Sequence, residues 1–439
     1  MKQKKTLSTF LIIWFGQLIS LLGTKMTSFA LLIWVYRETG QATAMALLGF
    51  FTFGSMVLMS PIGGYWTDRL DRRRVMLWSD LIAGLVTVMM LILISSGELQ
   101  LWHLYLGATL TGFCNAFQTP AYTAATTMLI PKKHYARVSG MRSLALGTAD
   151  IIAPMIAGAV VVFIGVQGVM VIDTVTFLFA VITLLFVKIP NPEPDTTLEK
   201  ESMWQKLTFG FHYIWQRDGL VGLLVVMSII NLLAALTYYG VFPAMILART
   251  GGDELALGYV EAALGAGGVI GSILITIWGG PKRKIHGVLA FTGISFLLGD
   301  FLFGIGHTVQ VWVFAGIAAA LFIPFIVGCN LAIWQAKVPA NLQGRVLNVQ
   351  NAIRQAMMPV GYIGGGLLAD FVFEPAMMPD GWLSPAFGWI VGTGDGAGMG
   401  VMFIITGFFG VVTGFGGYLF PALRNVERDL PDADEPVRA

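Results

Sequence analysis

The stretch GGYWTDRLDRRR, residues 63–74, joins two long apolar runs at about 43–66 and 75–96. Runs of about 20 apolar residues are long enough to cross the hydrocarbon core of a bilayer as α-helices. Because lipid offers no hydrogen-bonding partner, an uninterrupted apolar run satisfies its backbone groups only as a helix. The stretch therefore indicates a short charged loop between two membrane-spanning helices.

The composition extends this interpretation to the whole chain. Of its 439 residues, 56% are hydrophobic and 12% are charged, and the mean hydropathy is +0.75. A soluble domain has about 25% charged residues, so this chain could not cover itself with polar surface. We therefore predict an all-α integral membrane protein with twelve transmembrane helices. The predicted ranges are 8–36, 43–66, 75–96, 101–129, 136–164, 167–188, 219–248, 255–279, 286–306, 308–336, 346–373 and 398–422.

The basic residues predict the orientation of these helices. Almost all lie in segments that fall on one side of a twelve-helix chain, whereas only Arg37 and Arg249 end helices on the other side. Cytoplasmic loops carry an excess of Lys and Arg, so both termini are expected in the cytoplasm. Arg37 and Arg249 are expected to be interfacial anchors at the outer face, and possible outer-gate residues. The basic segments are 2–5, 69–74, 132–137, 188–217, 282–284, 337–345 and 424–438.

Two halves of the chain repeat each other. The segments IPKKHYARV (130–138) and VPANLQGRV (338–346) both place a proline six residues before Arg-Val. Matches of this kind recur in the same order, which is typical of transporters built from two related six-helix repeats. We predict an N-terminal bundle (1–188), a cytoplasmic linker (189–218), a C-terminal bundle (219–423) and a disordered cytoplasmic tail from Arg424. The linker should end in an interfacial helix at Met203–Trp215, where apolar and polar residues alternate at helical spacing.

The loop between the second and third helices resembles that of the major facilitator superfamily, whose pattern is Gly-x-x-x-Asp-Arg/Lys-x-Gly-Arg-Arg/Lys. Asp71 stands where the superfamily usually has glycine. This variant is similar to the drug:proton antiporter branch that includes macrolide-efflux proteins and the enterobactin exporter. Further resemblance lies in AFQTPAYTAATTMLIP (116–131) and in GRVLNVQNAIRQAMMPVGYIGGGLLAD (344–370). The resemblance covers essentially the whole chain and implies two pseudo-symmetric six-helix bundles.

The resemblance also implies a gate around Asp68. This carboxylate would contact Arg345 or Arg354 near the start of the eleventh helix when the cytoplasmic side is closed. The helix dipole would favour it by about 0.3–1 kcal/mol. An alternative interpretation of the arginines is a topology anchor with a solvated turn. The other expected members of this charge network are Arg69, Arg72, Arg73, Asp80 and Arg142.

Charged residues within the spans predict the coupling site. A charge near the bilayer centre costs about 2.5–3.5 kcal/mol on insertion scales, so it normally faces a cavity or a partner. Lys25 lies near the middle of the first helix and Asp150 near the middle of the fifth. We expect them to pair and to exchange a proton for substrate, although a fixed packing pair is equally compatible. Glu261 is a second proton-carrier candidate, or otherwise a wetted cavity wall. Asp173, Asp300 and Asp370 are expected to be structural.

The resemblance places helices one, four, seven and ten around a substrate cavity. Their polar and aromatic residues at mid-depth suit a bulky amphipathic molecule, although contacts between helices explain many such residues equally well. The candidate substrate-binding residues are Gln17, Asn115, Gln118, Asn231, Tyr238, Tyr239, Asn330, Trp334 and Gln335.

The sequence gives little support to other classes of function. The five histidines have no metal-ligand spacing, and Cys114 and Cys329 lie inside apolar segments. We expect no cofactor, no metal, no nucleic-acid partner and no enzymatic activity. The prediction is a monomeric exporter in the inner or plasma membrane. It would exchange protons for a drug such as a macrolide, or for a siderophore. A uniporter or importer of a similar metabolite is the alternative, and a non-transporting receptor or scaffold is less favoured.

Overall fold

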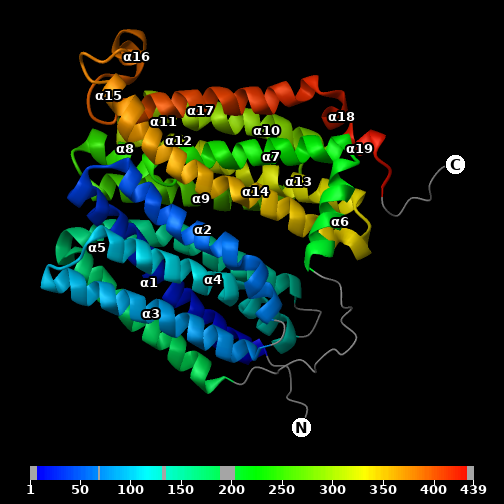
Figure 1. The fold of residues 1–439 in the computed structure, drawn as a ribbon, viewed down its shortest axis with the longest axis horizontal. Coiled ribbons are helices and arrows are strands. Elements are labelled where there is room, and N and C mark those ends of the chain that lie inside the picture. The colour runs from blue at the N-terminus through cyan, green and yellow to red at the C-terminus, as the bar shows by residue number, and fades with distance from the viewer. Residues whose placement is uncertain (1–6, 68–69, 131–134, 188–202, 433–439) are drawn as a thin grey trace. The chain divides into compact units, whose positions relative to one another are not determined.

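The computed structural model describes residues 7–67, 70–130, 135–187 and 203–432, and these residues form helices joined by short turns, without a strand (Figure 1). The predicted gate residues Asp68 and Arg69 and the first half of the linker lie outside the described residues. The described part falls into two compact units. Unit 1 comprises residues 1–198 and 250–262, and unit 2 comprises residues 199–249 and 263–439.

Unit 1 contains the first five helices and the beginning of α9. Their bounds are α1 Leu7–Thr39, α2 Ala42–Thr67, α3 Arg72–Ser96, α4 Leu101–Leu129 and α5 Tyr135–Phe186. The helix α9 begins at Glu254, so its first turns belong to this unit. Helix α1 packs along α5, and α2 packs along α4. The second pair approaches closely at Gly112, where an added Cβ would lie 2.9 Å from the backbone carbon of Thr52.

Helix α5 is two membrane spans joined end to end. Its candidate span covers 47 residues, or about 70 Å at 1.5 Å per residue, more than twice the hydrocarbon thickness. The interruption is Gly165, with φ 70° and ψ 179°. Only glycine adopts this backbone conformation readily, and it lies in the predicted gap between spans 136–164 and 167–188.

Unit 2 contains the remaining helices. Their bounds are α6 Met203–Trp215, α7 Asp218–Thr237, α8 Val241–Thr250, α9 Glu254–Trp278, α10 Lys284–Leu298, α11 Asp300–Ile305, α12 Val309–Leu321, α13 Ile323–Lys337, α14 Ala340–Leu368, α15 Glu374–Ala376, α16 Ser384–Val391, α17 Ala397–Gly416, α18 Pro421–Arg424 and α19 Val426–Asp429. A π-helical segment, Ala369–Phe373, follows α14, and a 3₁₀ turn, Gly417–Leu419, follows α17. Helix α14 packs along α7, and α17 packs along α10.

The helices supply twelve spans. Ten described helical segments are long and apolar enough to cross a membrane. One of them is the double span of α5, and α4 contributes a further helix of 29 residues. Several spans are broken rather than continuous, because α7 and α8, α10 and α11, and α12 and α13 are paired within single spans. Such breaks are tolerated where neighbouring helices satisfy the freed backbone groups.

The C-terminal segment differs from its prediction, because residues up to 432 are ordered against unit 2. The buried ammonium of Lys337 donates to the carbonyl oxygen of Glu427 at 2.6 Å and to Asp432 Oδ1 at 2.7 Å. The Glu427 carboxylate in turn accepts the backbone N–H groups of Lys284 and Ile285, at 3.0 and 2.9 Å, at the start of α10. A carboxylate is favourable at a helix N-terminus. The prediction of disorder from Arg424 onward is therefore wrong for residues 424–432.

Candidate functional site

The predicted coupling residues Lys25 and Asp150 form an ion pair between α1 and α5. Lys25 Nζ lies 2.9 Å from Asp150 Oδ1, and the two side chains are 46% and 48% exposed. Glu261 of α9 lies within electrostatic range of both. All three residues belong to unit 1. The structure thus brings together one cation and two carboxylates that the sequence placed on three separate helices.

Two glycines allow α5 and α9 to approach closely beside this cluster. A Cβ added to Gly158 would lie 2.9 Å from the carbonyl oxygen of Glu254, and one added to Gly258 would lie 2.8 Å from that of Pro154. Small residues at helix contacts let backbones approach in this way within membranes. The contact holds the first turns of α9 against α5, and Glu261 lies about one turn beyond Gly258 along the same helix.

Arg37 and Arg249 have different partners. Arg37 pairs with Glu254 at the start of α9, and both belong to unit 1. Arg249, in unit 2, donates to the carbonyl oxygens of Gly396, Gly304, Gly306 and Val391 at 2.6–3.2 Å. Sequence analysis missed Glu254, although an acid in the first turn of a helix was a usable signal. The Arg249 guanidinium is bound to backbone oxygens, and its role as an interfacial anchor stays a prediction.

Asp80 lies in a buried cluster with two glutamines rather than among arginines. Gln17 Nε2 donates to Asp80 Oδ2 at 3.0 Å, and Gln118 Nε2 donates to Oδ1. Asp80 is 7% exposed. Its membership of the arginine network around Asp68 stays a prediction. Gln17 and Gln118 hold this carboxylate, and their contact with a substrate stays a prediction.

The cluster leads to a stability prediction. Replacing Asp80 by Leu removes the acceptor for both glutamines, and each buried unsatisfied donor costs about 1–3 kcal/mol. Asp80→Asn keeps one carbonyl acceptor and a similar shape. We expect the unfolding midpoint of the purified protein to fall clearly for Asp80→Leu and only slightly for Asp80→Asn. The exposed acid Glu98, replaced by Leu, is the control. Equal midpoints for Asp80→Leu and Glu98→Leu would show that the cluster contributes nothing.

The predicted gating arginines contact aromatic rings and polar groups within their own units. The Arg142 guanidinium lies 5.1 Å from the ring centre of Tyr122, and that of Arg345 lies 5.7 Å from the ring centre of Phe209. Arg354 Nη2 donates to Asn351 Oδ1 at 3.3 Å. Arg73 donates to the carbonyl oxygens of Leu184 and Leu185, and Arg72 contacts Met128. Their role as partners of Asp68 stays a prediction.

Three of the predicted substrate residues are packed into unit 2. The Tyr238 hydroxyl donates to Asp300 Oδ2 at 2.9 Å, and its ring packs edge-on against Phe303 and Phe403. Trp334 is fully buried and donates to Asn330 Oδ1 at 3.2 Å. Buried tyrosine and tryptophan usually find a partner for their polar group. Trp334 and Asn330 are buried and Tyr238 is partly buried, and contact of these three residues with a substrate stays a prediction.

The other candidate substrate residues keep some accessible surface. Tyr239 is exposed and packs edge-on against Tyr362, and Gln335 is exposed. Asn115 and Asn231 are half-buried, and the Asn231 side chain donates to the carbonyl oxygen of Met227 at 2.7 Å. These residues remain candidates for contact with a substrate.

The protein has twelve spans, and three of them carry the Lys25–Asp150 ion pair and the third charged residue, Glu261. Such an arrangement is typical of a secondary membrane transporter. The model of the Major Facilitator Superfamily matches residues 13–362. The chain belongs to this superfamily and is a multi-pass protein of the bacterial cell membrane.

Known proteins support the same assignment. The chain is 25% identical over 348 residues to macrolide efflux protein A of Streptococcus pyogenes, covering 78% of this chain and 85% of the relative. It is 22% identical to the enterobactin exporter EntS of Salmonella typhimurium, covering 78% and 81%. Among solved structures, an inward-facing, unoccupied bacterial homologue of the human lysosomal transporter Spinster aligns with a TM-score of 0.71. That alignment covers 98% of this chain and 99% of the other at 17% identity, and so concerns the fold.

Proposed function

We propose that the protein exports a bulky amphipathic compound by alternating access, in exchange for protons. The observation that carries this proposal is the ion pair between Lys25 and Asp150, at 2.9 Å, with Glu261 in electrostatic range. Each of these charges is costly near the bilayer centre, so the group must face a cavity or remain compensated. The cluster has two carboxylates and one ammonium, so it carries one excess negative charge, and binding of one proton would remove that charge.

The cluster has one cation for two carboxylates. Lys25 can neutralise only one of the two carboxylates at a time, and uptake of one proton by the other would remove the remaining negative charge. Entry of a substrate that contacts Lys25 or Asp150 would shift this balance and release the proton. Alternating access would then link proton entry from one side of the membrane to substrate exit on the same side.

The class of substrate is proposed from two further observations. The accessible wall residues, such as Asn115 and Tyr239, offer few hydrogen bonds and much apolar surface, which suits an amphipathic ligand. The similar proteins are named for the efflux of a macrolide and of enterobactin. We therefore propose a drug, such as a macrolide, or a siderophore as the exported compound. Both termini would be cytoplasmic, and Asp68 with Arg345 and Arg354 would form the gate on that side.

Transport in proteoliposomes tests the proposal. A labelled macrolide and enterobactin are each loaded inside, and an inward proton gradient is imposed. We expect efflux of at least one of them to accelerate at least about tenfold over liposomes without protein, with matching proton influx. Substrate movement without proton movement would indicate a uniporter, and movement driven into the lumen an importer. Binding without movement would indicate a receptor. Each of these results would contradict proton-coupled export.

A further inference from the structure

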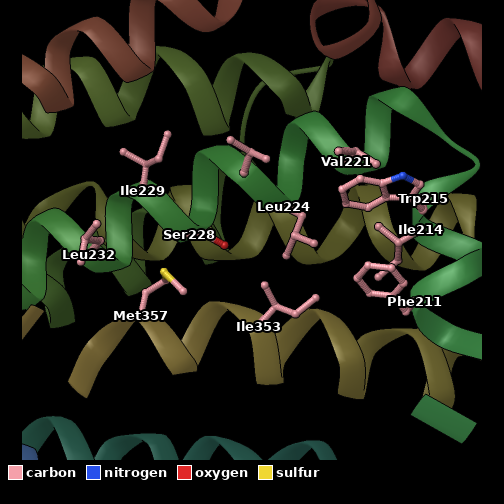
Figure 2. Close-up of a pocket in the computed structure, with 11 residues that line it drawn as sticks. Phe211, Ile214, Trp215, Val221, Leu224, Ser228, Ile229, Leu232, Ile353 and Met357 are labelled. Atoms are coloured by element: carbon pink, nitrogen blue, oxygen red, sulfur yellow. The ribbon is translucent and has the colours of Figure 1, made fainter. Parts of the chain in front are cut away.

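Unit 2 contains an apolar groove between the linker helix α6 and the spans α7 and α14. Its volume is about 380 Å³. Figure 2 shows Leu224 and Ser228 of α7 directed toward Ile353 and Met357 of α14, with the aromatic side chains of α6 at one end. The Ser228 hydroxyl and the Trp215 indole N–H are its polar side-chain groups, and the Ser228 oxygen is buried without a hydrogen-bond partner. The groove is therefore suited to a hydrocarbon occupant.

The groove has the length of one leaflet. Its lining on α7 extends from Val221 to Leu232, which is about 16 Å at 1.5 Å per residue. Half of a bilayer hydrocarbon core is about 15 Å. Because α7 begins at Asp218, directly after the linker helix, the groove runs from the membrane surface on the linker side toward the bilayer centre.

The end of the groove at α6 has the chemistry of a membrane interface. Phe211 and Trp215 stack with their ring centres 5.3 Å apart, and the Trp215 residue is 63% exposed. Aromatic residues are enriched at the level of lipid headgroups. Gly210 lets α6 approach α14, because a Cβ at this position would lie 2.8 Å from the carbonyl oxygen of Arg345. The linker helix thus forms the wall of the groove at headgroup depth.

Two arginines lie at this same end. The Arg217 guanidinium stacks 3.7 Å from the ring centre of Tyr213 and donates to the Tyr213 carbonyl oxygen at 2.8 Å. The Arg345 guanidinium lies 5.7 Å from the ring centre of Phe209 on α6. His212 is exposed nearby, and Asp218 is the one acid in the first turn of α7. Arg217 places a cation at this end of the groove, which favours an anionic headgroup.

We propose that this groove binds one acyl chain of an anionic phospholipid, with the phosphate held by Arg217. The lipid comes from the leaflet on the linker side. It fills the space between α6, α7 and α14 and fastens the linker helix to the C-terminal spans. Four features carry the proposal: the apolar wall, the length of one leaflet, the interfacial aromatic residues and the Arg217 cation.

Native mass spectrometry of the purified full chain tests the proposal. After removal of loosely bound lipid, phosphatidylglycerol or phosphatidylcholine is titrated and the bound fraction is measured. We expect one phosphatidylglycerol to bind, at least about tenfold more tightly than phosphatidylcholine. Ser228→Phe and Ile353→Trp, which fill the groove, should each weaken binding at least about tenfold. Ser228 makes no hydrogen bond, so its replacement removes no polar contact. Arg217→Gln should remove the preference for the anionic lipid.

The control is Ile273→Phe, an exposed position on α9 outside the groove, which should bind lipid like the wild type. Equal binding by the wild type and both groove-filling variants would overturn the proposal. Displacement of the lipid by an added macrolide or enterobactin at equimolar concentration would also overturn it, because the groove would then belong to the substrate. Lipid binding is measured without transport, so its outcome is independent of the proposed export.

Discussion

Replacing Asp150 by asparagine is expected to reduce proton-driven substrate efflux at least about tenfold while leaving the amount of folded protein nearly unchanged. The Lys25–Asp150 pair is about half-exposed, so its loss costs little stability, in the range of about 0–1 kcal/mol for a solvated pair. The loss of transport has a different cause. Without the Asp150 carboxylate, Lys25 pairs with Glu261, and no acid remains free to exchange a proton.

The decisive measurement is the pH dependence of efflux by the double variant Lys25→Met/Asp150→Asn in proteoliposomes. We expect substrate to move down its own gradient, with a rate that no longer responds to the proton gradient. The matched control is Arg37→Gln/Glu254→Gln, which removes a second described ion pair of unit 1 and contains no mid-span charge. This control should keep its response to pH. An unchanged pH dependence in the Lys25/Asp150 variant would mean that the pair is only a packing contact.

Local sequence features predicted the helices well. The linker helix begins and ends at its predicted residues, Met203 and Trp215, because its alternation of apolar and polar residues is a local property. The break in α5 lies at Gly165, where the predicted spans left a gap. The pairing of Lys25 with Asp150 could also be predicted, because a mid-span charge requires compensation and the resemblance placed the two helices side by side.

The direction of side chains within unit 2 could not be predicted in the same way. Tyr238 and Trp334 lie on the expected helices but are turned toward Asp300 and Asn330. A helix that is hydrophobic all round has no clear polar face, so its rotation about its own axis is set by packing with other helices. Asp80 illustrates the same limit, because its glutamine partners come from α1 and α4.

Arg249 connects several segments of unit 2 at a position where the sequence predicted an interfacial anchor. Its guanidinium joins α8 to the backbone beside α11 and to the loop before α17. Glu374 lies in electrostatic range and accepts the N–H groups of Gly396 and Met399 at 3.0 and 2.7 Å. The two side chains together fix the segment between α15 and α17. A planar group with five donors suits such a set of carbonyl oxygens better than an ammonium does.

Arg249→Met is therefore expected to lower the free energy of unfolding by about 3–5 kcal/mol, because it leaves several carbonyl oxygens without their donor and each buried unsatisfied group costs about 1–3 kcal/mol. Arg249→Lys should cost less, since an ammonium can satisfy some of the same oxygens.

The measurement is the unfolding midpoint in detergent, together with the yield of monodisperse protein. The control is Arg428→Met, because Arg428 is exposed and pairs only with its neighbour Asp429 among the described residues; a surface change of this kind stays within about 0.5 kcal/mol. If Arg249→Met and Arg428→Met unfolded at the same midpoint, the carbonyl contacts of Arg249 would contribute no stability, and its place would have to be explained by transport instead.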